Sequence, residues 1–293
     1  MKHESKSNIL NHIILILLCF CVIAPFIILV SASFSDEKEL ALQGYGLLPR
    51  GSSLEAYKFV FKNPKIIKDA YIVTIFVSIV YTLMATFLMA CVAFPLTRKD
   101  MVGRNQLNFY FYFCSLFGGG LIPTYILITQ YLHLNDTLWV YLLPHLISPW
   151  YIFMMRTFFN GIPGEISESA YIDGANEYTI FFRIIIPLSK PVIATVALMM
   201  FLAKWNDWMT SMLYINKEEL ISLQYMLQRI MENIKLLQNQ SQDLGFNILA
   251  ADEIPAETAR MAMAIVVAGP ALIIFPFFQK YFVKGLTVGS VKG

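Results

Sequence analysis

The chain has 293 residues, of which 57% are hydrophobic and only 14% are charged. A soluble globular domain has about 25% charged residues, so this composition excludes an ordinary soluble protein and favours a chain that lies in lipid. The formal net charge of +2 is too small to indicate a nucleic-acid partner.

Six apolar stretches are long enough to cross a membrane, because about 20 helical residues span ~30 Å of hydrocarbon. They cover residues 11–33, 70–97, 106–131, 138–158, 190–214 and 260–282. The sequence therefore predicts an all-α integral membrane protein, with residues 1–293 forming one transmembrane domain. Pro144 and Pro149 in the fourth stretch predict kinks rather than breaks, since neighbouring helices can satisfy the freed carbonyls.

The first stretch has two interpretations. Ser31-Ala32-Ser33 weakly resembles the cleavage site of a secretory signal peptide. However, the apolar run is longer than the roughly 7–15 residues of a signal core, and five further spans follow. We expect an uncleaved membrane anchor.

Positive charges predict the orientation of the six spans. Lysines and arginines gather before the first span, between the second and third, between the fourth and fifth, and after the sixth: Lys2, Lys6, Arg98, Lys99, Arg104, Arg156, Arg183, Lys190, Lys280, Lys284 and Lys292. Six spans place all of these on one side, which the positive-inside rule assigns to the cytoplasm. Both termini are then cytoplasmic, and segments 34–69 and 215–257 are external.

The external loop 215–257 carries a helical pattern. Apolar residues recur at spacings of four, three, four and three, at Leu223, Leu227, Ile230, Ile234 and Leu237. This spacing predicts an amphipathic helix. Two interpretations remain open: the helix lies on the transmembrane bundle, or it receives an extracytoplasmic partner.

Small residues and thiols in the spans have structural interpretations. Gly118, Gly119 and Gly120 allow either close helix packing or bending, and we expect packing. Cys19, Cys21, Cys91 and Cys114 lie in apolar runs without metal-ligand spacing, so we expect small buried side chains rather than a disulfide or a metal site. His12, His133 and His145 are scattered near span ends or within the fourth span, and we expect packing or interfacial roles.

Residues 159–187 form a polar segment between the fourth and fifth spans. Pro163 suits a first helical turn, and Glu165 and Glu168 suit a helix N-terminus. Gly174 can adopt the positive φ that ends one helix and starts another at an angle. The spacing alone allows either an ordinary cytoplasmic loop or a docking surface.

The same segment resembles the EAA signature of ABC importer permeases. That signature has an E-A-A triplet, a glycine after three intervening residues, and I-x-L-P beginning ten residues after the glycine. Here Glu168-Ser169-Ala170 is followed by Asp173-Gly174-Ala175 and by Ile184-Ile185-Ile186-Pro187, with Ser169 and Ile186 departing from the pattern. The resemblance implies a coupling helix that docks on an ATPase through these residues: Glu168, Ser169, Ala170, Asp173, Gly174, Ala175, Ile184 and Pro187.

The resemblance extends along nearly the whole chain. The six spans, the signature before span five and the external loop before span six resemble the maltose-type permeases of the carbohydrate-uptake family. Residues 117–125 (FGGGLIPTY) and 279–285 (QKYFVKG) resemble the branch linked to complex oligo- and polysaccharide uptake in Gram-positive bacteria. The family implies a bacterial cell membrane location, a second permease, two ATPase subunits, an extracellular solute-binding protein and an oligosaccharide substrate.

The chain has no G-x-x-x-x-G-K-[ST] loop, so it has no phosphate cradle of its own. We therefore expect a translocation subunit rather than an enzyme. It would hold no cofactor or metal, and ATP and Mg²⁺ would belong to the partner ATPase.

The fifth span contains Lys204-Trp205-Asn206-Asp207. Lys204 and Asp207 are three residues apart, so one helix face can hold them as a pair. A charge inside a membrane costs about 2.5–3.5 kcal/mol on insertion scales, and such residues often mark a transport path. These four residues are candidates for lining that path; the alternative is a structural pair at a subunit interface or near the headgroups.

Two further functions remain as alternatives. An ABC importer for another polar solute would have the same segments. An ion-coupled secondary transporter would need coupling carboxylates at the membrane midplane, often in internal repeats. Asp207 is a single candidate carboxylate, and we find no convincing repeat.

Overall fold

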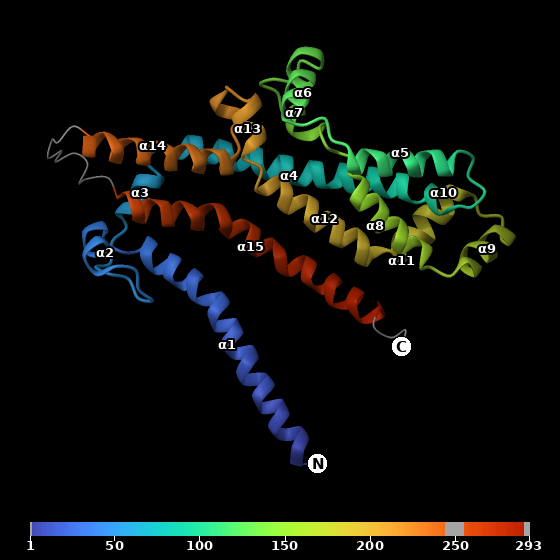
Figure 1. The fold of residues 1–293 in the computed structure, drawn as a ribbon, viewed down its shortest axis with the longest axis horizontal. Helices are drawn as coiled ribbons and strands as arrows, with labels where there is room; N and C mark the ends of the chain where they lie inside the picture. The colour runs from blue at the N-terminus through green and yellow to red at the C-terminus, as the bar shows by residue number, and fades with distance from the viewer. Residues whose placement is uncertain (1, 244–254, 290–293) are drawn as a thin grey trace. The chain divides into compact units, whose positions relative to one another are not determined.

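The computed structural model describes residues 2–243 and 255–289, so residues 244–254 of the predicted external loop lie outside the described residues. Within the described ranges the chain is helical, and strand-like pairing is confined to one isolated bridge between Ser35 and Ser52. Figure 1 labels the helices along the chain. The predicted all-α class is confirmed for these residues.

The chain separates into two compact units. The first comprises Met1–Ile67 and Leu227–Pro270, and the second comprises Lys68–Met226 and Ala271–Gly293. The first contains α1 (Lys2–Ser33), α2 (Glu37–Gln43) and α3 (Glu55–Val60). Three long helices contribute residues to both units: α4 (Pro64–Ala93), α14 (Leu223–Asp243) and α15 (Ala256–Gly289).

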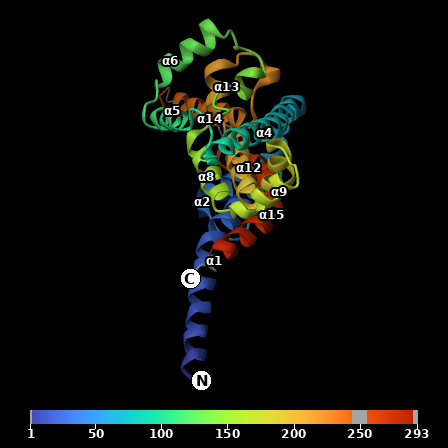
Figure 2. The same cartoon turned by 90° about the vertical axis from the view of Figure 1, so that its right-hand side faces the viewer.

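The second unit is built from shorter helical pieces. In chain order these are η1 (Pro95–Thr97), α5 (Arg104–Leu116), α6 (Leu121–Ile126), η2 (Leu127–Tyr131), α7 (Trp139–Leu142), α8 (Pro149–Asn160), α9 (Gly164–Ile172), α10 (Glu177–Ile180), η3 (Phe181–Ile185), α11 (Ile186–Leu188), α12 (Lys190–Trp205), α13 (Met209–Tyr214) and η4 (Glu218–Leu220). η2 and η3 are π-helical. Helices α8 and α12 pack side by side in both views (Figures 1 and 2).

The described helices include up to five candidate spans. Three are long and apolar enough by themselves: Asn11–Ser33, Pro64–Thr97 and Ala256–Ile274. Two more arise if each bent pair is one span; the pairs are Arg104–Leu116 with Leu121–Tyr131, bent by 111°, and Glu177–Leu188 with Lys190–Trp205, bent by 79°. The sequence predicted six continuous spans, so the later part of the chain is more broken than its hydropathy indicates.

The predicted third span, 106–131, turns sharply at its glycines. Helix α5 ends at Leu116 and α6 begins at Leu121. Gly120 has φ +81°, and a Cβ on Gly118 or Gly120 would meet no atom within 4 Å. The expectation of close packing at Gly118–Gly120 is therefore wrong, and these glycines lie in the turn between two helices.

The predicted fourth and fifth spans also contain breaks. In 138–158, α7 ends at Leu142 and α8 begins at Pro149, so the prolines accompany a break instead of a kink. Pro149 occupies the start of α8, where its missing N–H costs little. In 190–214, helix α12 ends at Trp205 and α13 begins at Met209.

Helices form in both segments that the sequence predicts to be external. Ser53 accepts a hydrogen bond from the Glu55 N–H at the start of α3 (3.2 Å). The amphipathic pattern after residue 222 forms α14, in which Leu223 and Ile234 are buried. The helical interpretation of this stretch is confirmed.

In the first unit, the side chain of Glu37 caps α15. Its carboxylate accepts hydrogen bonds from the backbone N–H groups of Glu257 and Thr258 (2.9 Å each) and from the Thr258 hydroxyl (2.7 Å). A carboxylate at a helix N-terminus satisfies free N–H groups and complements the helix dipole. Thr258 is 1% exposed, so this cap lies largely away from solvent.

The four cysteines are free thiols. Cys19, Cys21 and Cys114 are exposed on the chain, which corrects the expectation that they are buried in it. In the most hydrophobic stretch of α1, 0% of the residues are buried within the chain. Cys19 and Cys21 therefore lie on a helix whose apolar side chains are exposed.

Candidate functional site

The polar segment 159–187 folds as two short helices joined at Gly174. Helix α9 ends at Ile172, and Gly174 has φ +80°, a conformation that an L side chain rarely adopts. The Ala175 N–H donates to the Ala170 carbonyl (2.9 Å), and the Gly174 N–H donates to the Tyr171 carbonyl (3.0 Å). These bonds satisfy carbonyls at the end of α9 and fix the turn.

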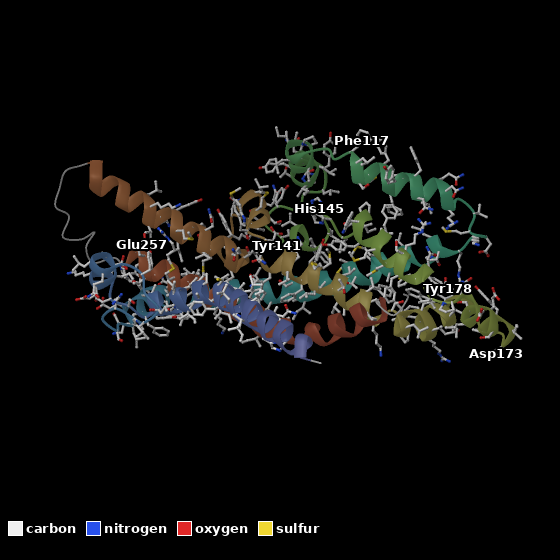
Figure 3. All side chains as sticks on the ribbon, turned by 60° about the horizontal axis from the view of Figure 1, so that its bottom comes forward. Phe117, Tyr141, His145, Asp173, Tyr178 and Glu257 are labelled. Atoms are coloured by element: carbon white, nitrogen blue, oxygen red, sulfur yellow. The ribbon has the colours of Figure 1, made fainter. Side chains whose placement is uncertain are left out.

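Asn176 then starts the second helix. Its side-chain oxygen accepts from the Thr179 N–H (2.8 Å) and from the Thr179 hydroxyl (2.9 Å), which caps α10. Two helix signals, a C-terminal glycine and an N-terminal asparagine, therefore lie within three residues. Figure 3 labels Asp173 at this turn and Tyr178 on α10.

The predicted docking residues differ in exposure. Glu168, Ser169, Asp173, Gly174 and Pro187 are exposed, Ala175 and Ile184 are half-buried, and Ala170 is buried. Ala170 is 8% exposed, so its small side chain allows close packing within the chain.

Arg98, which follows α4 and η1, contacts the polar segment 159–187. It donates to the Glu177 carboxylate (3.1 Å), and its guanidinium lies over the rings of Phe94 (4.8 Å) and Tyr171 (5.7 Å). The Tyr171 hydroxyl also donates to Glu177. Burial raises the pKa of Tyr171, and the hydrogen bond to Glu177 raises it further, so the hydroxyl stays protonated as the donor.

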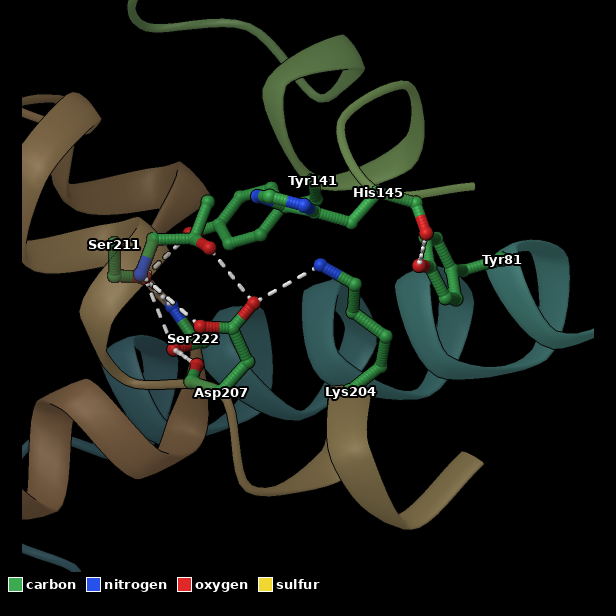
Figure 4. Close-up of polar contacts among 8 residues, drawn as sticks. Tyr81, Tyr141, His145, Lys204, Asp207, Ser211 and Ser222 are labelled. Atoms are coloured by element: carbon green, nitrogen blue, oxygen red, sulfur yellow. Dashed lines mark hydrogen bonds and ion pairs between the residues drawn. The ribbon is translucent and has the colours of Figure 1, made fainter. Parts of the chain in front are cut away.

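The predicted Lys204–Asp207 pair is present (Figure 4). The Lys204 ammonium donates to Asp207 Oδ2 (3.0 Å), and the two side chains are only 10% and 17% exposed. Asp207 also accepts from the Thr210 N–H (3.0 Å) and hydroxyl (2.7 Å), which caps α13 after the break. Lys204 lies over the Tyr81 ring at 4.6 Å, and the Tyr81 hydroxyl donates to the His145 carbonyl (2.6 Å).

The two residues between this pair have different environments. Trp205 is 2% exposed and stacks on Phe201, with ring centroids 5.6 Å apart. Trp205 therefore packs inside the chain and cannot stack on a sugar in this conformation. Asn206 is exposed, although its amide donates to the Leu202 carbonyl (2.8 Å).

A buried hydroxyl network holds the break in place. Ser211 donates to Ser222 (2.9 Å), and the Ser222 hydroxyl lies 3.0 Å from the Asp207 carbonyl that accepts from it. Tyr141, at 1% exposure, contacts the Ser211 hydroxyl and donates to the Leu220 carbonyl (2.9 Å). The backbone around Asp207 is thus fixed from α7 and from the start of α14.

Comparisons with known proteins identify the family. The family model described as "Binding-protein-dependent transport system inner membrane component" matches residues 4–288. The chain belongs to this family. It is therefore a membrane-embedded translocation subunit of the ABC transporter permease type.

Relatives of this permease align along nearly the whole chain. The polygalacturonan/rhamnogalacturonan transport system permease protein YtcP of Bacillus subtilis (strain 168) is 36% identical over 293 residues, 100% of each chain. Protein LplC of the same organism is 38% identical over 271 residues, covering 92% of this chain and 90% of that protein. A solved structure of a bacterial ABC transporter involved in the import of the acidic polysaccharide alginate has TM-score 0.79 and 27% identity, covering 96% and 98% of the two chains.

Sequence reasoning missed several residues that this permease brings together. Arg98 was treated only as a topology charge, and its contact with Glu177 joins segments 79 residues apart. Ile172 and Tyr178 are 87% and 78% exposed, and neither was considered a docking residue. Among residues 2–243 and 255–289, no group of three or more His, Cys, Asp or Glu side chains is arranged to hold a metal ion.

Proposed function

We propose that this chain is one of two permease subunits of an ATP-driven importer that takes up an oligosaccharide or a polysaccharide fragment by alternating access. Family membership supports the transporter class. The substrate class rests on the relatives, whose names specify polygalacturonan, rhamnogalacturonan and alginate. An importer for another polar solute is the alternative within the class.

The exposed helix pair around Gly174 carries the proposal. Helix α9 presents Glu168 and Ser169 to solvent and ends at the exposed Ile172. Asp173 is exposed at the turn, and Tyr178 is exposed on α10. Exposed apolar side chains among polar ones are typical of a protein interface. We propose that α9 is the coupling helix, that it faces the cytoplasm, and that an ATPase subunit receives it.

The proposed complex contains partners that complete the missing chemistry. The chain lacks a phosphate-binding loop, so two separate ATPase subunits bind ATP and Mg²⁺ and hydrolyse ATP. An extracellular binding protein delivers the oligosaccharide, and a second permease forms the other half of the path. Motion of α9 with the ATPases then reaches α4 through the Arg98–Glu177 pair.

Lys204, Asn206 and Asp207 remain the proposed path residues. Asn206 is exposed at the break between α12 and α13, and the paired charges lie directly beside it. Irregular backbone at membrane depth is tolerated where it lines a cavity or is buried in protein. Trp205 contributes to the wall that supports this break.

One pair of variants tests the coupling role. Ile172→Arg should abolish co-purification of the ATPase and uptake of labelled oligosaccharide, while the permease still reaches the membrane. Leu48→Arg makes the same change at another exposed apolar side chain, 78% exposed, and should keep the ATPase bound.

The outcomes separate the alternatives. Retention of the ATPase and of uptake by Ile172→Arg would reject docking at α9. Uptake by the purified chain alone in vesicles, driven by an ion gradient without ATP, would instead show a secondary transporter. Titration of the co-purified binding protein with oligogalacturonides and with neutral dextrins tests the substrate class.

A further inference from the structure

A largely apolar pocket of about 510 Å³ lies where the end of α4 meets α10 and η3. Its lining is mostly aromatic and aliphatic, with three charged side chains: Phe87, Cys91, Phe94, Pro95, Arg98, Asp100, Met101, Glu177, Tyr178, Phe181 and Phe182. All of these residues belong to the second unit. The proposed path does not include this pocket, which shares Tyr178 with the proposed docking surface and Arg98 and Glu177 with the proposed link to α4.

The pocket follows one face of a candidate membrane span. Phe87, Cys91, Phe94 and Arg98 occur at spacings of four, three and four, which places them in one row along α4 and η1. At 1.5 Å per residue this row is about 16 Å long. The hydrocarbon core is ~30 Å thick, so the row covers about one leaflet.

The row runs from an apolar end to a charged end. Phe87 and Phe182 are each 50% exposed and stack with centroids 6.4 Å apart, so this end of the row lies at the surface of the unit. Phe94 and Phe181 are buried, with centroids 5.1 Å apart. Arg98 follows at the end of η1, where a span reaches the headgroup region.

The charged end contains one cation and two carboxylates. Arg98 donates through Nη2 to Glu177, while its buried Nε has no hydrogen-bond partner. Asp100 adds a second carboxylate to the lining. A phosphate would accept hydrogen bonds from the guanidinium of Arg98, and a primary ammonium would pair with the two carboxylates.

We propose that the pocket binds one membrane phospholipid, with an acyl chain along Phe87–Phe94 and a phosphoethanolamine headgroup at Arg98, Asp100 and Glu177. An anionic lipid without an ammonium group would meet two carboxylates and one cation. The zwitterionic headgroup matches both signs of charge. The inference requires that α4 spans the membrane, and it is independent of the transported solute.

The bound lipid would join α4 to the segment that follows α9. The pocket walls already meet through Arg98–Glu177 and through the two ring pairs. An acyl chain between them adds apolar contact and removes the facing apolar surfaces from water. The lipid therefore stabilises the position of α10 against α4.

The first test uses the unaltered complex. Phosphatidylethanolamine that carries a photoreactive diazirine in its acyl chain is incorporated into nanodiscs with the complete transporter. Adducts mapped by peptide mass spectrometry should lie in 87–101 and 177–182. Adducts confined to other lipid-facing residues, or cross-links from the pocket to the ATPase in place of lipid, would overturn the proposal.

The second test uses matched variants and native mass spectrometry after exposure to equal phosphatidylethanolamine and phosphatidylglycerol. Cys91→Trp fills the pocket and should lower phosphatidylethanolamine retention about ten-fold. Ile75→Trp adds the same ring to an exposed position of α4 outside the pocket and should change nothing. Equal retention by Cys91→Trp and the unaltered chain would contradict an acyl chain in this pocket.

The headgroup is tested by a neighbouring pair of charge changes. Arg98→Gln should reduce phosphatidylethanolamine retention, whereas Lys99→Gln, which removes the same charge from an exposed residue outside the lining, should not. Equal retention of the two lipids by the unaltered chain would reject the phosphoethanolamine assignment. Because retention is measured without uptake, these results are separable from failure of the importer proposal.

Discussion

Individual polar side chains hold this permease together at the places where its helices break. Asp207 illustrates the role, because one carboxylate pairs with Lys204 and also caps α13 through Thr210. Asp136 links two loops, because its carboxylate accepts hydrogen bonds from the backbone N–H groups of Asn216 and Lys217 after α13. In both cases a short acidic side chain accepts from backbone N–H groups that no helix hydrogen bond satisfies.

The Lys204–Asp207 pair gives the first prediction. Asp207→Asn keeps an oxygen that can cap α13 but leaves the buried ammonium without its counter-charge. Breaking a buried pair costs about 3–5 kcal/mol, and the remaining contact with the Tyr81 ring places the expected loss near the lower limit, about 3 kcal/mol. Unfolding in SDS, followed by tryptophan fluorescence, measures the change.

The double variant provides the control for that measurement. Lys204→Met with Asp207→Asn removes both charges, so it should recover stability relative to Asp207→Asn alone. A double variant that is less stable than either single variant would show that the two charges do not act as a pair.

Asp136 gives a pH prediction. Hydrogen bonds from the Asn216 backbone and side chain lower the pKa of Asp136 below its ordinary value. Since the folded pKa is lowered, the stabilisation is present above the unfolded pKa of about 3.9 and is lost as pH falls through the lower folded value. Amide exchange at Asn216 and Lys217 should therefore lose protection below about pH 4, after correction for intrinsic rates.

A substitution removes the titrating group from that experiment. Asp136→Ala should lower protection of these two amides at neutral pH and should abolish the pH step. If the step persisted in Asp136→Ala, another group would be responsible for it.

At the scale of elements, the sequence was informative about helices and less so about their ends. The apolar spacing from Leu223 predicted α14, and Gly174 predicted the turn after α9, because both signals are local. The breaks in 138–158 and 190–214 were missed because hydropathy averages over a window and does not register caps. The Tyr141–Ser211–Ser222 network that holds one break joins residues distant in sequence, which spacing alone cannot reveal.

The contact between α2 and α15 was also invisible in the sequence, and it gives a prediction. Glu37→Ala leaves the N–H groups of Glu257 and Thr258 without their acceptor and should destabilise the chain by about 1–2 kcal/mol. Glu39→Ala removes an acidic side chain from the same helix, where its carboxylate accepts a hydrogen bond from Gln43. Thermal unfolding in one detergent should distinguish the two variants.

The expected order of melting temperatures depends on the acceptor oxygens at the N-terminus of α15. Glu37→Gln keeps one acceptor oxygen and should fall between the unaltered chain and Glu37→Ala. Equal melting temperatures for Glu37→Ala and Glu39→Ala would show that capping of α15 does not contribute to stability.

At the scale of the whole molecule, composition predicted the membrane class correctly. The lengths of the helices alone do not fix the number of membrane crossings. Helix α8 has 12 residues, about 18 Å at 1.5 Å per residue, and cannot alone cross ~30 Å of hydrocarbon. Together, α7, the break and α8 form a segment of residues 139–160, which has the roughly 20 residues that a crossing needs. Six spans require that this broken segment crosses; five spans would place the two termini on opposite sides.

Two single cysteines decide between these topologies. Leu48 and Ile172 are exposed apolar positions, 78% and 87%, and three predicted spans lie between them. In a background that lacks the native thiols, a membrane-impermeant maleimide should label Leu48→Cys in intact cells and should label Ile172→Cys only after permeabilisation. Labelling of both in intact cells would mean that an even number of segments crosses between them, which would remove 138–158 as a span and place α9 outside the cytoplasm, beyond the reach of an ATPase.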